Sequence, residues 1–249
     1  MPKKNVHHNV IPIRSGAKET APAKLSPEQM QQEIERLNKE QKDICEMAVR
    51  CILNALDLKD HYTFGHSMRV AFFCRKLGEQ LKLNPNDMYE LELAALFHDI
   101  GKIGVPDAVL LKPARLTEEE FLQMKKHPEK SAEILQDFPH FHKIAQYAKH
   151  HHERYDGRGY PSGLKGEDIP LYSRIILIAD TFDAMTSTRT YRKGLEYSVA
   201  FQELQDFAGS QFDKELVNKF VEAMRADEAQ SEKTFTLRII NGEFSKKAA

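Results

Sequence analysis

The amino-acid sequence predicts an all-α protein that folds as a helical bundle, and three observations support this fold class. Apolar residues recur at intervals of three and four over most of the chain from 26 to 226, as they do on amphipathic helices. Helix-start patterns such as Ser26-Pro27 precede several of these segments. Only 173–186 and 234–240 contain the apolar, β-branched runs of a strand. We interpret the first run as a buried helix and expect at most a C-terminal strand from the second.

Length and composition fit a globular protein and exclude several functional classes. The 249 residues can form one sizeable core or two small domains, and 41% hydrophobic with 29% charged residues is an ordinary globular balance. The 36 Lys and Arg residues against 37 Asp and Glu residues give a net charge of −1. This charge excludes the strongly basic surface of a general nucleic-acid binder, so we expect no DNA partner.

The expected location is the cytoplasm, without a membrane partner. No apolar run approaches the roughly 20 residues that span a bilayer, and the first residues lack the apolar stretch of a signal peptide. The three cysteines are an odd number without metal-like CxxC spacing, which favours a reducing compartment.

The N-terminal part is expected to contain a tail followed by a long helix. Residues 1–25 carry prolines and no periodic apolar pattern, which indicates a disordered tail. Ser26 caps the helix expected over 26–58, and Gln41 is the one polar break in its heptad pattern. The apolar heptad positions are Met30, Ile34, Leu37, Ile44, Ala48, Cys51, Ala55 and Leu58. This pattern predicts either a coiled coil that forms a homodimer or a helix packed on its own bundle.

The main domain is expected over 59–227 and begins with two helices. The first follows Gly65, because apolar residues then recur every three or four positions. The second is capped by Asn86 or Asp87, which follow a proline turn, and it ends at 104–106, where glycine and proline break the pattern.

Three more helix boundaries can be predicted in the middle of the chain. Thr117 and Glu120 have the spacing of a capping box, in which each side chain binds the other residue's backbone. Pro128 directly follows His127 and favours a fresh helix there. A further helix is expected to end with 151–152.

The last part of the domain combines a loop with three helices. Four glycines and two prolines across 156–170 indicate a loop. The run over 173–186 is the expected buried helix. Two C-terminal helices are expected between 196 and 226, with a break near Gly209. Residues 228–249 are expected to form a C-terminal tail.

Five histidines and two aspartates stand out as candidate metal ligands. They are His66, His98, Asp99, His127, His151, His152 and Asp180. Several expected helices carry them, and metal sites in helical bundles are built from side chains on facing helices. Asp180 lies in an apolar run, where a carboxylate is costly to bury unless a cation or strong donors neutralise it. Mixed imidazole and carboxylate ligands suit Fe, Mn, Ni or Zn better than Ca. The alternative is that each residue is a separately hydrogen-bonded core residue.

Six stretches of the sequence match one known family. They are DHYTFGHSMRV (60–70), LFHDIGKIGVPDAVLLKPARLT (96–117), HP (127–128), HHERYDGRGYPSGLKGEDIP (151–170), ADTFDAMTSTRTYR (179–192) and GSQFDKELV (209–217). Through them the sequence resembles the HD-GYP branch of the HD metal-dependent phosphohydrolases, a group of bacterial cyclic di-GMP phosphodiesterases. The resemblance covers residues 45–225, and both motif pieces, 98–99 and 159–161, are intact. It implies an HD-domain helical bundle, with 59–227 as the HD-GYP catalytic domain.

The resemblance also implies a two-metal site. One ion is bound by His66, His98 and Asp180, the other by His127, His151 and His152, and Asp99 bridges both. The implied reaction is hydrolysis of cyclic di-GMP to pGpG by a hydroxide held between two divalent ions, which also stabilise the attacking and leaving oxygens. Fe and Mn are the expected ions, with Ni, Zn and Mg as alternatives.

Tyr62 bears on the number of metals and on the product. Trinuclear members of the family carry a glutamate at this position that helps to hold a third ion, and a tyrosine is not a comparable ligand for a hard cation. The resemblance therefore implies a binuclear site with pGpG as the main product and slow further cleavage to GMP.

Five further residues are assigned to substrate binding by the resemblance. Lys102 matches a lysine that contacts the scissile phosphate and shares the catalytic role of the bridging aspartate. Arg189 and Arg192 match basic positions that hold the remaining phosphate. Tyr160 is expected to stack on a guanine or to hydrogen-bond the ligand, and Asp183 completes the group.

Two carboxylates and one loop have more than one interpretation. Glu153 and Asp183 are candidates for orienting ligand histidines, and ordinary salt bridges are the alternative. The loop over 156–170 is linked in the family to contacts with diguanylate cyclases. A structural turn with Tyr160 as its apolar plug is the alternative for the loop.

Two other functions remain open from the sequence. The same chemistry can act on another cyclic dinucleotide or on a nucleotide, or the chain can be a catalytically silent HD-GYP scaffold that signals through its loop. The complete set of seven candidate ligands favours an enzyme.

Overall fold

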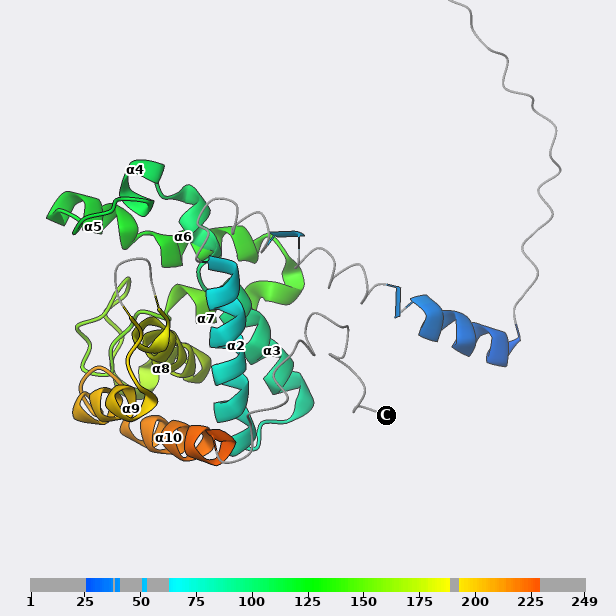
Figure 1. The fold of residues 1–249 in the computed structure, drawn as a ribbon. Coiled ribbons are helices and arrows are strands. Elements are labelled where there is room, and N and C mark those ends of the chain that lie inside the picture. The colour runs from blue at the N-terminus through cyan, green and yellow to red at the C-terminus, as the bar shows by residue number, and fades with distance from the viewer. Residues whose placement is uncertain (1–25, 38, 41–50, 53–62, 189–192, 229–249) are drawn as a thin grey trace, which may run out of the picture. The chain divides into compact units, whose positions relative to one another are not determined.

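The computed structural model describes residues 26–37, 39–40, 51–52, 63–188 and 193–228 (Figure 1). The chain divides into two units, Met1–Cys45 and Glu46–Ala249. The described residues are helical or irregular and contain no β-strand, with one isolated bridge between Ala208 and Phe212. The predicted all-α fold class is confirmed.

The N-terminal unit contributes a helix whose described residues are 27–37 and 39–40. Ser26 caps this helix as predicted. Its Oγ accepts the backbone N–H of Gln29 at 3.2 Å, and the Gln29 side chain accepts the Ser26 N–H at 2.9 Å. These two bonds satisfy donors that a helix N-terminus otherwise leaves unpaired.

Three apolar side chains of this helix are about half exposed. They are Met30, Ile34 and Leu37, and their spacing of four and three residues puts them on one face. Of the rest of the helix expected over 26–58, the structure describes 51–52, which are helical. The expected tail over 1–25 and the run at 234–240 lie outside the described residues.

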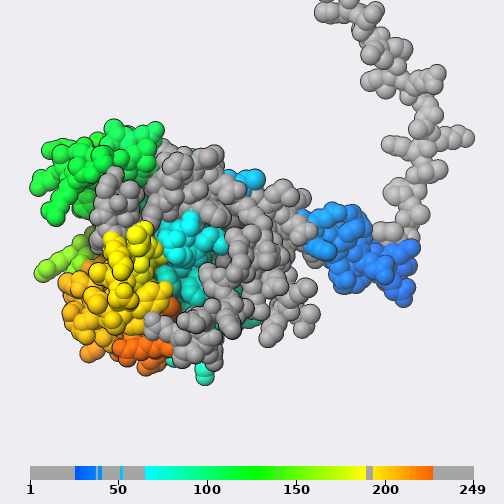
Figure 2. Space-filling view, viewed as in Figure 1, coloured from blue at the N-terminus to red at the C-terminus, as the bar shows by residue number. Residues whose placement is uncertain are grey.

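The second unit is a helical bundle. Its elements are α2 (Thr63–Gln80), α3 (Pro85–Phe97), the 3-10 helix η1 (Ile100–Gly104), α4 (Asp107–Leu110), α5 (Glu118–Met124), α6 (His127–Gln136), η2 (Pro139–Phe141), α7 (His142–Lys149), η3 (Gly166–Asp168), α8 (Leu171–Thr186), α9 (Tyr197–Asp206) and α10 (Lys214–Glu228). In Figure 1, α2 lies centrally and packs against α3, α8 and α10. In Figure 2, α4 and α5, coloured green, form a block at one edge of this unit.

Aromatic side chains form the centre of the core. The Phe182 ring on α8 lies 5.0 Å from Phe73 on α2, 5.1 Å from Phe220 on α10 and 5.4 Å from Phe201 on α9, between ring centroids. All four residues are buried, and each buried ring contributes about 1.5–3 kcal/mol to stability. The run over 173–186 is therefore a buried helix, as predicted, and the contact of Phe182 with Phe73 packs this helix, α8, against α2.

Several predicted boundaries are confirmed. The capping box of Thr117 and Glu120 is complete at the start of α5, and α6 begins at His127. Residues 156–170 form a loop in which the only regular element is η3, and α9 and α10 are separated by a turn that contains Gly209 at φ +87°.

Other boundaries differ from the prediction. The cap of α3 is Asn84 and not Asn86 or Asp87, because the Asn84 side chain accepts the N–H groups of both of those residues and Pro85 occupies the first helical position. The first helix of the main domain already begins at Thr63, ahead of Gly65.

Two predicted helices end before their candidate ligands. The helix α3 ends at Phe97, so 98–99 lie in a turn and the 3-10 helix η1 follows, whereas the sequence predicted one helix up to 104–106. The helix α7 ends at Lys149, so 151–152 also lie in a turn. Neighbours on an α-helix point about 100° apart, and a turn releases adjacent side chains from that constraint.

Candidate metal centre

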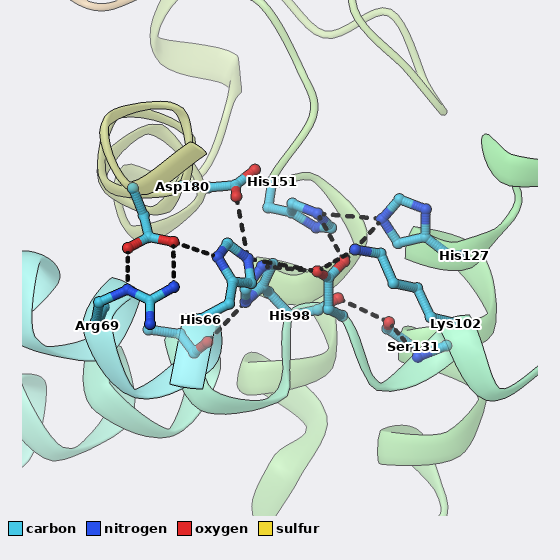
Figure 3. Close-up of polar contacts among 12 residues, drawn as sticks. His66, Arg69, His98, Lys102, His127, Ser131, His151 and Asp180 are labelled. Carbon is cyan, nitrogen blue, oxygen red and sulfur yellow. Dashed lines mark hydrogen bonds and ion pairs between the residues drawn. The ribbon is translucent and has the colours of Figure 1, made fainter. Parts of the chain in front are cut away.

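Seven candidate ligands from five parts of the bundle converge on one centre. Figure 3 labels five of them, His66, His98, His127, His151 and Asp180. His66 comes from the start of α2, His127 is the first residue of α6, and Asp180 lies on α8. The turns after α3 and α7 supply the remaining four. The ligand atoms form three overlapping groups, each with all atoms within 4.8 Å of one another: His66, His98 and Asp180; His127, His151 and His152; and His98, Asp99 and His151. The structure thus brings together every ligand position that the sequence singled out.

Asp99 lies between two of these groups. Its Oδ2 is 3.3 Å from His98 Nε2 and 3.6 Å from His66 Nε2. Its Oδ1 is 3.2 Å from His127 Nε2 and 3.9 Å from His151 Nε2. Each carboxylate oxygen therefore faces a different group of histidines, which is the arrangement that a bridging carboxylate requires.

The backbone fixes which ring nitrogen of three histidines faces the centre. The Nδ1 atoms of His98, His127 and His151 lie 2.7, 2.8 and 2.6 Å from the carbonyl oxygens of Ala95, Met124 and Ala148. A carbonyl only accepts, so each Nδ1 carries the hydrogen, and a neutral ring presents the lone pair of Nε2 to the centre. Metal-binding histidines commonly donate their other N–H in this way.

The inward nitrogens lack ordinary hydrogen-bond donors. His98 Nε2 is fully buried and has no hydrogen-bond partner among the described residues. His127 Nε2 and His151 Nε2 are 3.3 Å apart, and with both hydrogens on Nδ1 neither can donate to the other. Buried acceptors without donors are costly, and a cation between them removes the cost. The donor set therefore fits metal ions.

The ionisation states also suit metal binding. Burial works to raise the pKa of Asp180, but the hydrogen bond and charge of His66 hold that pKa well below its usual value. Burial likewise acts to raise the pKa of Asp99, and the nearby ammonium of Lys102 outweighs it, so that pKa is also lowered. Both carboxylates are anionic. Burial and its histidine neighbours lower the pKa of His152 to about 3, so this imidazole is neutral.

A glycine and a serine hold the turn after α3 against α6. A Cβ atom on Gly101 would lie 2.0 Å from the carbonyl oxygen of His127, so only glycine allows this close approach. Ser131 Oγ donates to the carbonyl of His98 at 2.7 Å and accepts the Gly101 N–H at 2.8 Å. Neither Gly101 nor Ser131 was predicted from the sequence; the glycine two positions after the 98–99 pair was the one local sign of this close contact.

Lys102 and Asp183 both lie at the centre, in different environments. Lys102 Nζ is 2.7 Å from Asp99 Oδ2. Asp183 is fully buried, and its Oδ2 lies 2.8 Å from His66 Nδ1. Its two oxygens also accept from the guanidinium of Arg69, which the sequence analysis did not identify. Asp183 is thus directed at a ligand histidine.

The loop over 156–170 is attached to the turn that carries His152. Glu153 is buried, and its Oε1 accepts the Ser162 N–H at 2.6 Å. The Tyr160 N–H donates to the His152 carbonyl at 3.2 Å, and the Tyr160 ring centroid is 4.9 Å from that of His152. A Cβ atom on Gly159 would lie 2.3 Å from the next backbone nitrogen along this turn, so the contact requires glycine.

Three residues with expected roles lie outside the described part of the chain. They are Tyr62, Arg189 and Arg192. Among the helices that the structure does describe, none combines the length and the apolar character needed to cross a bilayer.

Comparison with known proteins finds relatives with similar sequences and a solved structure with a similar fold. The chain is 40% identical over 173 residues to the cyclic di-GMP phosphodiesterase of Thermotoga maritima, covering 68% of this chain and 47% of that protein. It is 45% identical over 139 residues to the 3'3'-cGAMP-specific phosphodiesterase 1 of Vibrio cholerae, covering 56% of this chain and 32% of the relative. The chain thus spans half or less of the length of these relatives.

A solved structure supports the fold independently. The structure of a cyclic GMP-AMP-specific phosphodiesterase of V. cholerae matches with a TM-score of 0.56 at 20% identity, over 75% of this chain and 51% of that chain. The family described as HD domain matches residues 50–216. Motifs, fold and relatives agree that this chain belongs to the HD domain family, as its resemblance to the HD-GYP branch implies.

Proposed function

We propose that this chain is a metal-dependent phosphodiesterase that hydrolyses cyclic di-GMP to pGpG, with 59–227 as its catalytic domain. The observation that carries the proposal is the position of Asp99, whose two oxygens face two separate groups of histidines at 3.2–3.9 Å. The similarity to the T. maritima cyclic di-GMP phosphodiesterase supports the choice of substrate.

Two divalent metal ions are the proposed cofactors. His66, His98 and Asp180 would hold one ion, His127, His151 and His152 would hold the other, and Asp99 would contact both. A bound pair of this kind lowers the pKa of water and stabilises the attacking and leaving oxygens of a phosphodiester. The mixed imidazole and carboxylate set favours Fe or Mn, with Ni, Zn and Mg as weaker candidates.

The remaining residues would position the substrate. Lys102 holds its ammonium 2.7 Å from Asp99, next to the place where a phosphate must bind to reach both metals. There it would neutralise charge that develops on the phosphoryl oxygens. Arg189 and Arg192 would hold the second phosphate of the cyclic dinucleotide. Tyr160 lies against His152 and would border the bound nucleotide.

A second candidate substrate is 3'3'-cGAMP. The 45% identity to a V. cholerae phosphodiesterase specific for this dinucleotide favours it as the alternative. A substrate panel separates the two candidates: protein purified without oxygen and loaded with Mn²⁺ or Fe²⁺ is assayed with cyclic di-GMP, 3'3'-cGAMP and cyclic mononucleotides. We expect the fastest hydrolysis with cyclic di-GMP. Full metal loading without hydrolysis of any of these compounds would instead favour a signalling scaffold.

The identity of the product gives a further test. Tyr62 replaces the glutamate that would help to bind a third ion, so we propose a binuclear site that releases pGpG and forms GMP only slowly. Chromatography of a time course measures both products. GMP formed as fast as pGpG would contradict this part of the proposal.

Two proposed partners involve other parts of the chain. We propose that the helix over 26–58 pairs with a second copy, because Met30, Ile34 and Leu37 expose an apolar face at heptad spacing. Light scattering of the full chain and of an Ile34→Glu variant tests this, with loss of the dimer expected in the variant. The loop over 156–170 is the proposed contact for a diguanylate cyclase, and pull-down with loop variants tests that contact.

A further inference from the structure

The buried carboxylate of Asp183, which contacts His66, also forms an ion pair with Arg69. Arg69 Nε lies 2.5 Å from Asp183 Oδ1, and Arg69 Nη2 lies 3.1 Å from Asp183 Oδ2 (Figure 3). This is a two-point contact, in which the planar guanidinium matches both carboxylate oxygens. Asp183 has no solvent-exposed surface, so its orientation depends on these protein contacts.

The same carboxylate orients a candidate metal ligand. Asp183 Oδ2 accepts from His66 Nδ1 at 2.8 Å, and the opposite ring nitrogen of His66 lies 3.2 Å from Asp180 Oδ1. His66 and Arg69 are three residues apart on α2, so their side chains share one face, and Asp183 reaches both from α8. Arg69, Asp183 and His66 therefore form one continuous line of contacts that ends at the metal centre.

We propose that Arg69 is a positioning residue that fixes His66, through Asp183, for binding one of the two metal ions. The inference rests on the proposed metal centre. The terminal torsion of an aspartate is soft, so a carboxylate held at fewer points can rotate. Ser187 Oγ also contacts Asp183 Oδ1, at 3.0 Å, but it offers a single point of contact. Of the His66, Arg69 and Ser187 side chains that contact this carboxylate, the guanidinium is the one that engages both oxygens, and it keeps Oδ2 in line with the His66 ring.

A second arginine on the same helix provides a matched control. Arg75 Nη1 lies 3.0 Å from Oε1 of Glu92, another buried carboxylate, so this pair also joins α2 to a neighbouring helix. Glu92 is in none of the three groups of candidate ligands. Removing Arg75 therefore tests the structural cost of losing an arginine–carboxylate pair without touching the metal centre.

The experiment compares three variants of the full chain, Arg69→Met, Arg69→Lys and Arg75→Met. Metal content, the dissociation constant for Mn²⁺ and the EPR spectrum of the Mn²⁺-loaded protein are measured for each, and thermal unfolding reports the structural cost. In Arg69→Met we expect one of the two ions to bind about 10- to 100-fold more weakly, the range typical for groups that orient metal ligands. The EPR signal of a coupled Mn²⁺ pair should change to that of single ions.

The other two variants make the result specific. Arg69→Lys keeps the charge but loses the fork, so we expect partial recovery of metal binding. Arg75→Met should bind both ions like the wild type even if it unfolds at a lower temperature. Wild-type metal binding in Arg69→Met, or an equal loss in Arg75→Met, overturns the inference. A wild-type protein that binds no metal overturns the proposed function as well, so the two failures can be told apart.

A double-variant cycle tests the route through Asp183. If Arg69 acts through this carboxylate, Asp183→Asn weakens metal binding and adding Arg69→Met to it has little further effect. Additive losses in the double variant would mean that Arg69 acts independently of Asp183, and this part of the inference would be wrong.

Discussion

The two groups of candidate ligands differ in charge and in what holds them. The group of His66, His98 and Asp180 contains its own carboxylate, and a second buried carboxylate, Asp183, backs His66. The group of His127, His151 and His152 contains imidazoles alone. Backbone carbonyl oxygens orient His127 and His151, as one does His98 of the first group, and the Tyr160 ring lies against His152.

This difference acts in opposite directions on the pKa of His66 and on the pKa values of two histidines of the other group. Burial alone would lower the pKa of His66, but Asp180, Asp183 and Asp99 outweigh it, and the pKa is raised. In the other group burial and neighbouring imidazoles lower the pKa values of His151 and His152. The first group thus attracts positive charge more strongly, and we expect it to hold its metal ion more tightly. Among the seven candidate ligands, Asp99 is the one whose two oxygens face histidines of both groups.

Replacing Asp99 should have the largest effect on metal binding, because both groups then lose the carboxylate that they share. We expect Asp99→Ala to bind neither ion stably. The variant should lose several kcal/mol of transition-state stabilisation, so we expect its rate of hydrolysis to fall by at least about 10³-fold. Circular dichroism should show the helical content largely unchanged. A variant with wild-type metal content and rate would exclude the two-metal proposal.

Removing one ligand from each group should separate the two positions. Asp180→Ala and His152→Ala should each retain one ion, and the affinity for the other should fall by more than about 100-fold, since even groups that only orient ligands cost 10- to 100-fold. The larger loss is expected for Asp180→Ala, which also removes a charge. Titration calorimetry with Mn²⁺ measures both.

A neighbouring histidine serves as the control for these variants. His150 is buried, bonds to the Gln146 carbonyl at 2.9 Å and belongs to none of the ligand groups. His150→Ala should bind two ions. A loss in His150→Ala equal to that in His152→Ala would mean that the turn over 150–152 is sensitive to any change, and the distinction between the groups would be lost.

The sequence identified the candidate ligands better than it identified the backbone that carries them. The residue types and motif spacing pointed to all seven positions, which the structure brings together. The helix ends next to them could not be predicted from periodicity. Past the end of α3 at Phe97, Gly101 lies against the carbonyl of His127, a contact between segments far apart in the chain that no local pattern predicts.

The supporting residues were harder to find for a related reason. Arg69 lies on the amphipathic helix α2, where a lone arginine is typical of a solvent-facing position. Its role becomes visible only once α8 brings Asp183 against it. Local patterns predict which elements form, whereas the contacts that orient ligands depend on how those elements pack.

Removing the metal ions should show that the two groups bind their ions with different affinity, because the two ions should dissociate at different times. With a chelator added to the loaded protein, we expect the first ion to leave from the group of His127, His151 and His152, here called the imidazole-only group. Each ion present at 100 times its dissociation constant stabilises the fold by about 2.7 kcal/mol, so the melting temperature should fall in two steps as the ions are removed. Metal analysis of timed samples checks the order. Simultaneous loss of both ions would contradict two positions of different affinity.

Gly159→Ala should give the smallest effect and should act on one group alone. The added Cβ would lie 2.3 Å from the Arg154 nitrogen, so the loop has to move away from the turn that carries His152. Such overpacking typically costs about 1–3 kcal/mol of stability. We expect a higher KM and weaker binding of the ion at the imidazole-only group, with the ion near Asp180 unaffected. Gly166→Ala in the same loop is the control: its φ of +60° carries the usual backbone penalty, but a Cβ there meets nothing within 4 Å. If both variants change metal binding equally, loop strain rather than contact with the histidine turn is the cause, and the loop does not support the imidazole-only group.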